Sequence, residues 1–133
     1  MPEGKEPKKV LIIDEESLSV QEVGAYLGKH GYDILTANDG LTGLKLARLE
    51  NPALVIVDGV LPTVSGYQLT RLLKFDERYK HIPIAFTSHK NSDTEEILVT
   101  NLGADLFLTK PIELDGLLEM LEDIMAPDEE ESV

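Results

Sequence analysis

Four short, nearly continuous apolar runs in this sequence each end at polar side chains capable of chemistry. The runs, each with the residues that follow it, are Val10–Ile13 before Asp14 and Glu15, Leu54–Val57 before Asp58, Ile82–Phe86 before Thr87 and Ser88, and Leu106–Thr109 before Lys110 and Pro111. Such runs are typical of strands in a parallel sheet that is covered on both faces. Open α/β sheets build their sites at the carboxyl ends of these strands. We therefore expect acids, hydroxyls and an ammonium group to meet at one sheet edge, where they suit a divalent cation and a phosphoryl group.

Helical patterns separate the apolar runs. Ser19 and Glu22 have the spacing of a capping box at the start of a first helix, and Ser92 and Glu95 repeat that spacing later in the chain. A further strand is expected at Tyr32–Ala37. The last helix carries the clearest apolar stripe, made of Leu114, Leu117, Leu118, Leu121, Ile124 and Met125. Five strands alternating with five helices predict an α/β fold with a doubly wound parallel sheet.

Length and charge limit the classes of protein to which the chain can belong. Its 133 residues suffice for one domain with a single core. The 25 acidic and 12 basic residues give a net charge of −13, which disfavours nucleic acid as a partner. No membrane-spanning apolar stretch or secretory signal is visible and cysteine is absent, so we expect a cytoplasmic protein whose partner is another protein. The expected domain covers residues 9–125, between a flexible segment at 1–8 and an acidic tail or linker start at 126–133.

Two loop sequences add to this pattern. Residues 58–62 read DGVLP, with a glycine at position 66, and residues 103–111 read GADLFLTKP. Together with the acid pair, the hydroxyl pair and Lys110, these motifs resemble the receiver domain of two-component response regulators (CheY-like) over nearly the whole chain. The resemblance implies a flavodoxin-like fold, in which five helices flank a five-stranded parallel sheet with strand order 2-1-3-4-5.

An aspartate that accepts a phosphoryl group brings negative charge toward negative charge. A divalent cation removes this repulsion and bridges to the phosphoryl oxygens. Since Mg²⁺ prefers oxygen ligands, Asp14, Glu15 and Asp58 are the candidate side-chain ligands. Lys110 and the Thr87 hydroxyl are candidates to neutralise further phosphoryl oxygens. The resemblance implies that Asp58 is the phosphoacceptor, with Mn²⁺ as a substitute for Mg²⁺.

The resemblance also assigns roles to residues around this centre. It adds the backbone carbonyl of Val60 to the metal ligands. It makes Phe107 the switch aromatic, which turns inward when the threonine of the site moves toward the phosphoryl group. Ser88, His89 and Pro111 are assigned to secondary tuning of the reaction, and the peptide bond before Pro111 is expected to be cis, as in the family.

Simpler interpretations remain open for each motif taken alone. An acid pair at a strand end also occurs as a helix cap, and Asp58 followed by glycine is a common turn signal. Thr87 and Ser88 also suit a polar strand end, and Lys110 a solvated surface position. The chain departs from the family at Glu15, where aspartate is usual, and this departure puts the affinity for the metal in question.

The resemblance implies signal relay by reversible phosphorylation. A histidine kinase or a histidine phosphotransfer protein donates a phosphoryl group from its phosphohistidine to Asp58. The domain then switches its output face toward a downstream protein or a fused effector domain, and a homodimer that forms on phosphorylation is left open. Such a domain catalyses its own phosphorylation and dephosphorylation but is not a turnover enzyme. Neither nucleic acid nor a membrane is expected as a partner.

Two other functions are weighed against this one. A degenerate receiver would bind proteins without being phosphorylated, and the departure at Glu15 keeps that alternative open. An aspartyl phosphohydrolase normally needs an acid two residues after its nucleophile, where Val60 stands. A nucleotide or flavin site fits worse, because the first loop carries three acids at positions 14–16 and the sequence lacks a glycine-rich phosphate-binding motif.

Overall fold

The computed structural model describes residues 7–125, which form five strands and five helices in strict alternation. The strands are β1 (Lys9–Ile13), β2 (Asp33–Ala37), β3 (Leu54–Asp58), β4 (Ile84–Ser88) and β5 (Leu106–Thr109). The helices are α1 (Ser17–Lys29), α2 (Gly40–Glu50), α3 (Gly66–Lys74), α4 (Asp93–Asn101) and α5 (Leu114–Met125). The expected tail at 126–133 and most of the expected segment at 1–8 lie outside the described residues.

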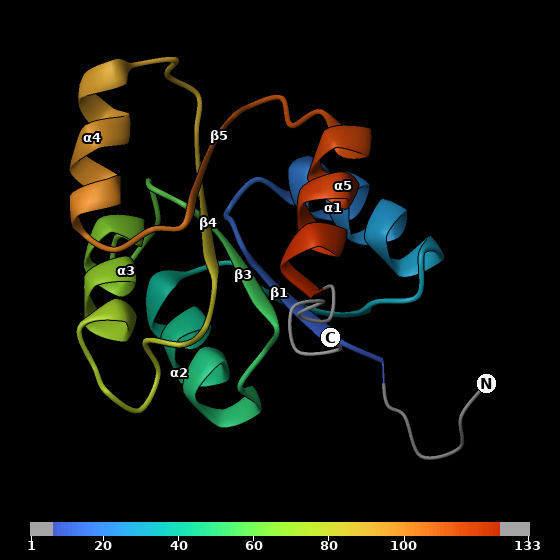
Figure 1. The fold of residues 1–133 in the computed structure, drawn as a ribbon, viewed down its shortest axis with the longest axis horizontal. Coiled ribbons are helices and arrows are strands. Elements are labelled where there is room, and N and C mark those ends of the chain that lie inside the picture. The colour runs from blue at the N-terminus through green and yellow to red at the C-terminus, as the bar shows by residue number, and fades with distance from the viewer. Residues whose placement is uncertain (1–6, 126–133) are drawn as a thin grey trace, which may run out of the picture.

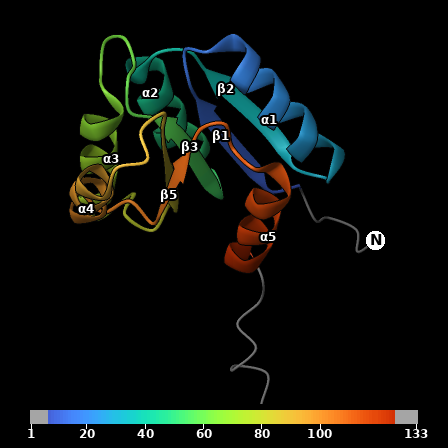
Figure 2. The ribbon, with the colours of Figure 1, turned by 90° about the horizontal axis from the view of Figure 1, so that it is seen from above.

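All five strands are parallel, and their order across the sheet is β2-β1-β3-β4-β5. Helices α1 and α5 cover one face of the sheet, and α2, α3 and α4 cover the other (Figure 1 and Figure 2). The predicted doubly wound fold and its strand order are thereby confirmed. Because the strands are parallel, the carboxyl ends of β1, β3, β4 and β5 share one edge, and the register places Asp58 of β3 beside Thr87 of β4.

Alternate residues of the strands pack into two cores, one on each face of the sheet. The core under α2, α3 and α4 includes Leu11, Ile13, Val55, Val57, Phe86, Leu44, Leu69, Leu73 and Val99. The core under α1 and α5 includes Val10, Ile12, Ile56, Ala85, Val23, Leu27, Leu117 and Leu121. Burial on both faces explains why the strand sequences are apolar almost throughout. It also fixes the strands rigidly, so that the polar residues at their carboxyl ends have defined positions.

The first helix begins earlier than the sequence indicated. Helix α1 starts at Ser17 with Glu16 as its N-cap residue, so Ser19 lies inside the helix and the predicted capping box of Ser19 and Glu22 is wrong. The Glu16 backbone is extended, with φ −81° and ψ 103°, as an N-cap requires. This earlier start places Glu16 at the junction of the β1 loop and α1, next to the edge where the strand ends meet.

The two helices next to β5 differ in how they use their apolar residues. Most of the apolar stripe of α5 is confirmed: Leu117 and Leu121 are buried, and Leu114, Leu118 and Met125 pack against the same core, whereas Ile124 is 37% exposed. In α4, by contrast, Ile97 and Leu98 are 63% and 49% exposed, and Val99 is the buried residue. Helix α4 therefore leaves apolar side chains on the surface. Within residues 7–125, no helix has the length and apolar character needed to cross a membrane.

Candidate functional site

Four of the expected site residues converge at the carboxyl edge of the sheet. Asp14 directly follows β1, Asp58 ends β3, Thr87 lies near the end of β4, and Lys110 directly follows β5. All four are buried, with exposed fractions of 5% for Asp14, 5% for Asp58, 1% for Thr87 and 7% for Lys110. Since buried polar groups are costly unless they are paired, their arrangement must supply partners for one another.

The Lys110 ammonium binds three carboxylates. Its Nζ lies 2.6 Å from Asp14 Oδ2, 2.7 Å from Glu16 Oε1 and 3.0 Å from Asp58 Oδ2. Burial by itself lowers the pKa of Lys110, but the hydrogen bonds to the three carboxylates outweigh burial and raise this pKa above its ordinary value. Lys110 is therefore a fixed positive charge at neutral pH.

Asp58 combines burial with a single strong partner. Burial raises the pKa of its carboxyl, Lys110 lowers it, and the Asp14 charge raises it again, with a net upward shift. The backbone N–H of Val60 donates to Asp58 Oδ1 over 3.4 Å. Asp58 is thus a desolvated carboxylate that is held in place by an ammonium group, which is the environment expected of a nucleophile.

The third acid of this centre is Glu16, not Glu15. Ligand oxygens of Asp14, Glu16 and Asp58 all lie within 4.8 Å of one another. The second oxygen of Glu16 lies 2.7 Å from His89 Nε2. Glu15 is exposed and lines a neighbouring hollow together with Asp14, so its role as a metal ligand stays a prediction.

Glu16 is not among the predicted site residues, although the chain carries a signal for it. Glu16 lies two positions after Asp14 and is the N-cap residue, at which the chain turns into α1. Its backbone N–H donates to Asp14 Oδ1 over 2.9 Å. This short turn returns the Glu16 side chain toward the strand ends. A helix start at Ser17 would have revealed this placement, whereas the expected start near Ser19 concealed it.

The loop after Asp58 is shaped by Gly66. A Cβ atom at this position would lie 2.1 Å from the Asp58 carbonyl oxygen, so only glycine fits without displacing the backbone of the acceptor residue. The Gly66 N–H donates to the Gly59 carbonyl over 3.0 Å, which closes the loop. Helix α3 then begins with a complete capping box formed by Ser65 and Gln68, which was not foreseen. The loop therefore anchors Asp58 from its carboxyl side.

The two hydroxyls of β4 have different partners. The Thr87 hydroxyl donates to the Val57 carbonyl over 3.3 Å, and the Ser88 hydroxyl donates to Glu95 Oε1 over 2.6 Å. The other oxygen of Glu95 accepts a hydrogen bond from the Tyr67 hydroxyl. Burial and this hydrogen bond raise the pKa of Tyr67 to about 12. A polar network that sequence analysis did not anticipate thus joins the end of β4 to α3 and α4.

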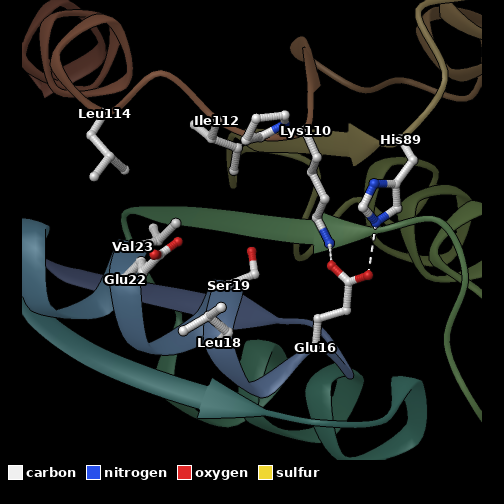
Figure 3. Close-up of a pocket in the computed structure, with 10 residues that line it drawn as sticks. Glu16, Leu18, Ser19, Glu22, Val23, His89, Lys110, Ile112 and Leu114 are labelled. Atoms are coloured by element: carbon white, nitrogen blue, oxygen red, sulfur yellow. Dashed lines mark hydrogen bonds and ion pairs between the residues drawn. The ribbon is translucent and has the colours of Figure 1, made fainter.

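The remaining expected residues surround the centre. The Phe107 ring is partly buried and stacks on Phe86 at a centroid distance of 6.3 Å and an interplanar angle of 11°. The cis peptide bond before Pro111 is confirmed. Val60 is 76% exposed at the rim. A cavity of about 310 Å³ opens between α1 and the segment that follows β5, beside Glu16, His89 and Lys110 (Figure 3).

The donor set at this edge fits a divalent cation. Three carboxylates, of which those of Asp14 and Asp58 are buried, share one ammonium group, which leaves excess negative charge at this edge. Carboxylate oxygens are the ligands that Mg²⁺ and Mn²⁺ prefer, and a buried group of acids is stabilised when a cation joins it. Among residues 7–125, Asp14, Glu16 and Asp58 form the acidic group that is close enough to hold an ion.

Comparisons with known proteins agree with this geometry. A family model described as the response regulator receiver domain matches residues 10–122. The protein PilH of Pseudomonas aeruginosa is 34% identical over 118 residues, which are 89% of this chain and 98% of PilH. The structure of the chemotaxis response regulator CheY4 of Vibrio cholerae covers 89% of this chain and 98% of its own, with a TM-score of 0.82 at 27% identity. A third similar structure is the receiver domain of the sensor histidine kinase PA1611 from Pseudomonas aeruginosa, which was solved with a magnesium ion coordinated in its active-site cleft. It has a TM-score of 0.82 at 20% identity and covers 91% of this chain and 99% of its own.

Proposed function

Since this chain belongs to the response regulator receiver domain family, we propose that Asp58 accepts a phosphoryl group from a phosphohistidine of a histidine kinase or a histidine phosphotransfer protein. The observation that carries the proposal is the buried pair of Asp58 and Lys110, whose charged atoms lie 3.0 Å apart. A carboxylate with a raised pKa is a better nucleophile than an ordinary one, and the ammonium beside it is placed to receive the charge of the incoming group.

The transfer exchanges one bond to phosphorus for another. The bond between phosphorus and the donor imidazole nitrogen breaks while a bond between phosphorus and an Asp58 oxygen forms. The imidazole keeps the electron pair of the broken bond and takes up a proton from solvent, and Asp58 becomes an acyl phosphate. Lys110 and the Thr87 hydroxyl then bind phosphoryl oxygens. Attack by water on the acyl phosphate later restores the carboxylate and releases inorganic phosphate.

The proposed cofactor is Mg²⁺, with Mn²⁺ as a substitute. Asp14 and Asp58 would hold the cation, joined, as the family resemblance implies, by the Val60 carbonyl and by Glu15. Glu16 belongs to the same acidic group but is already paired with Lys110 and His89. When bound, the cation offsets the mutual repulsion of the carboxylates and supplies positive charge to the phosphoryl group. The magnesium ion in the PA1611 receiver domain supports this assignment.

The proposed output is a change in the surface formed by α4, β5 and α5. If the Thr87 hydroxyl leaves the Val57 carbonyl for a phosphoryl oxygen, space opens at the end of β4, and Phe107 is the adjacent aromatic side chain able to fill it. The exposed Ile97 and Leu98 on α4 supply apolar contact area for a protein partner. Ser88 and Pro111 would tune the same switch. We place the protein in the cytoplasm, where the target of the switch would be a downstream protein or a fused effector domain.

Phosphorylation by acetyl phosphate, followed by intact-protein mass spectrometry, tests the proposal. In this reaction acetate leaves as the Asp58 oxygen bonds to phosphorus, so no kinase is required. The wild type should gain the mass of one phosphoryl group in Mg²⁺ and none in EDTA, and Asp58→Asn should gain none while keeping its circular dichroism spectrum. A wild type that stays unlabelled in Mg²⁺ with both acetyl phosphate and phosphoramidate would instead favour a protein-binding module that works without phosphorylation.

A further inference from the structure

The Glu16 carboxylate bridges Lys110 and His89 at the mouth of the site (Figure 3). Its Oε1 accepts a hydrogen bond from Lys110 Nζ over 2.7 Å, and its Oε2 lies 2.7 Å from His89 Nε2. A glutamate with these two partners is an anion at neutral pH. The Glu16 carboxylate is therefore bound to the Lys110 ammonium, which a phosphoryl group would also need to bind.

Lys110 has no N–H group left over for a further anion. A lysine ammonium carries three N–H donors, and Lys110 has three carboxylate partners, on Asp14, Glu16 and Asp58. All three contacts are 3.0 Å or shorter. A phosphoryl oxygen can therefore bind Lys110 fully only when one of the carboxylates gives up its contact.

Burial decides which carboxylate leaves. The side chains of Asp14 and Asp58 are 5% and 7% exposed, whereas that of Glu16 is 46% exposed. A displaced aspartate would stay buried and would lose its ammonium partner even where a bound cation remains, which is costly. Glu16 instead reaches water by rotating its own side chain. Its side chain makes no capping hydrogen bond to α1, so the start of the helix does not depend on it.

We propose that Glu16 is a positioning residue that holds Lys110 and His89 in the resting state and competes with the incoming phosphoryl group for both. The inference rests on the proposed function and concerns the regulation of the same site. When the phosphoryl group arrives, Glu16 moves to solvent, and Lys110 and His89 turn to phosphoryl oxygens. The resting contact slows phosphorylation and weakens the binding of phosphoryl analogues such as beryllofluoride.

Labelling rates of four variants test this proposal, with acetyl phosphate and Mg²⁺ as the reagents. Glu16→Gln removes the charge, and Glu16→Asp keeps the charge but shortens its reach to Lys110. Both should raise the labelling rate and lower the beryllofluoride concentration for half-saturation by roughly two- to fivefold, the range expected for an exposed ion pair. His89→Ala should give a smaller rise, because it loosens Glu16 but also removes a partner of the phosphoryl group. Adding it to Glu16→Gln should therefore give no further gain.

Glu22→Gln is the matched control. Glu22 lines the same cavity, so this substitution also removes one negative charge beside the site. The three carboxylates that contact Lys110 belong to Asp14, Glu16 and Asp58, so the contacts of Lys110 are left intact. If Glu16→Gln is no faster than Glu22→Gln, general electrostatics explains the rate and the proposal is overturned. It is also overturned if Glu16→Gln weakens the stabilisation by Mg²⁺ alone, since Glu16 would then be a metal ligand. A wild type that cannot be labelled refutes the proposed function, whereas a labelled wild type with unchanged Glu16 variants refutes this inference alone.

Discussion

Replacing Asp58 with asparagine should make the metal-free protein more stable, although it removes the residue at the centre of the proposed activity. The Asp58 carboxylate lies within 4.8 Å of the carboxylates of Asp14 and Glu16, and 3.0 Å from the Lys110 ammonium. Asparagine keeps the shape of the side chain and can still accept a hydrogen bond from Lys110. It removes the charge, and with it both repulsions and the cost of desolvating an ion.

The magnitude follows from these distances. At an effective dielectric constant near 20, a carboxylate at the 4.8 Å limit repels Asp58 by ~3 kcal/mol, and Lys110 at 3.0 Å attracts it by ~5 kcal/mol. The two repulsions and the single attraction therefore nearly cancel, and solvent screening weakens the contribution of the exposed Glu16. Burial then tips the balance against the charge, as the raised pKa of Asp58 indicates. We expect Asp58→Asn to stabilise the protein by about 1 kcal/mol, or about 4 °C in Tm.

Thermal unfolding in EDTA, followed by circular dichroism, measures this effect. Asp33→Asn is the control, because Asp33 is an exposed aspartate at the opposite end of the sheet, where β2 begins. In Mg²⁺ the order should reverse: the wild type gains stability with a saturating dose response, by about 2.7 kcal/mol at a hundredfold excess over Kd, and Asp58→Asn gains less. An Asp58→Asn protein that is less stable than the wild type in EDTA would refute the electrostatic reasoning.

Three further predictions follow from the site and its loop. Because the pKa of Asp58 is raised in the folded state, its carboxyl stabilises the fold most at low pH, where it is protonated. In EDTA, the wild type should therefore lose stability relative to Asp58→Asn as the pH rises above about 4. A difference in Tm between the two proteins that stays constant over that pH range would contradict this. Lys110→Ala leaves three acids without their ammonium and should cost about 3 kcal/mol in EDTA, with partial rescue by Mg²⁺, whereas alanine at the exposed Lys90 should have little effect. Gly66→Ala should cost about 1–3 kcal/mol and slow labelling of Asp58. Gly28→Ala, whose Cβ would lie 3.9 Å from Ile34 inside helix α1, should raise stability by up to about 1 kcal/mol and leave labelling unchanged; equal effects of the two substitutions would show that the backbone at Gly66 is not restrictive.

The fold could be predicted because several independent signals agree. The apolar runs of β1, β3 and β4 are buried on both faces and that of β5 is partly buried, so they carry no alternation that could be mistaken for an antiparallel strand. The ends of these runs then placed Asp14, Asp58, Thr87 and Lys110 at one edge, since parallel strands share the direction of their carboxyl ends. The convergence of these four residues followed from topology, without any knowledge of side-chain contacts.

Side-chain partners were harder to predict, because they depend on small differences in backbone geometry. A capping-box spacing at Ser19 suggested a late start for α1, while the chain turns into the helix at Ser17. That difference of three residues in the N-cap position conceals that Glu16, and not Glu15, faces Lys110. The contact of Glu95 with Ser88 and Tyr67 joins three elements, and no local sequence pattern encodes a contact of that kind.

The most direct test of the account locates the acyl phosphate on the chain. Borohydride reduces an aspartyl phosphate to homoserine, and peptide mass spectrometry then identifies the modified residue. After treatment with acetyl phosphate and Mg²⁺, homoserine should appear at position 58 and disappear when EDTA replaces Mg²⁺. Homoserine at Asp14 or at any other aspartate, with Asp58 intact, would contradict the account.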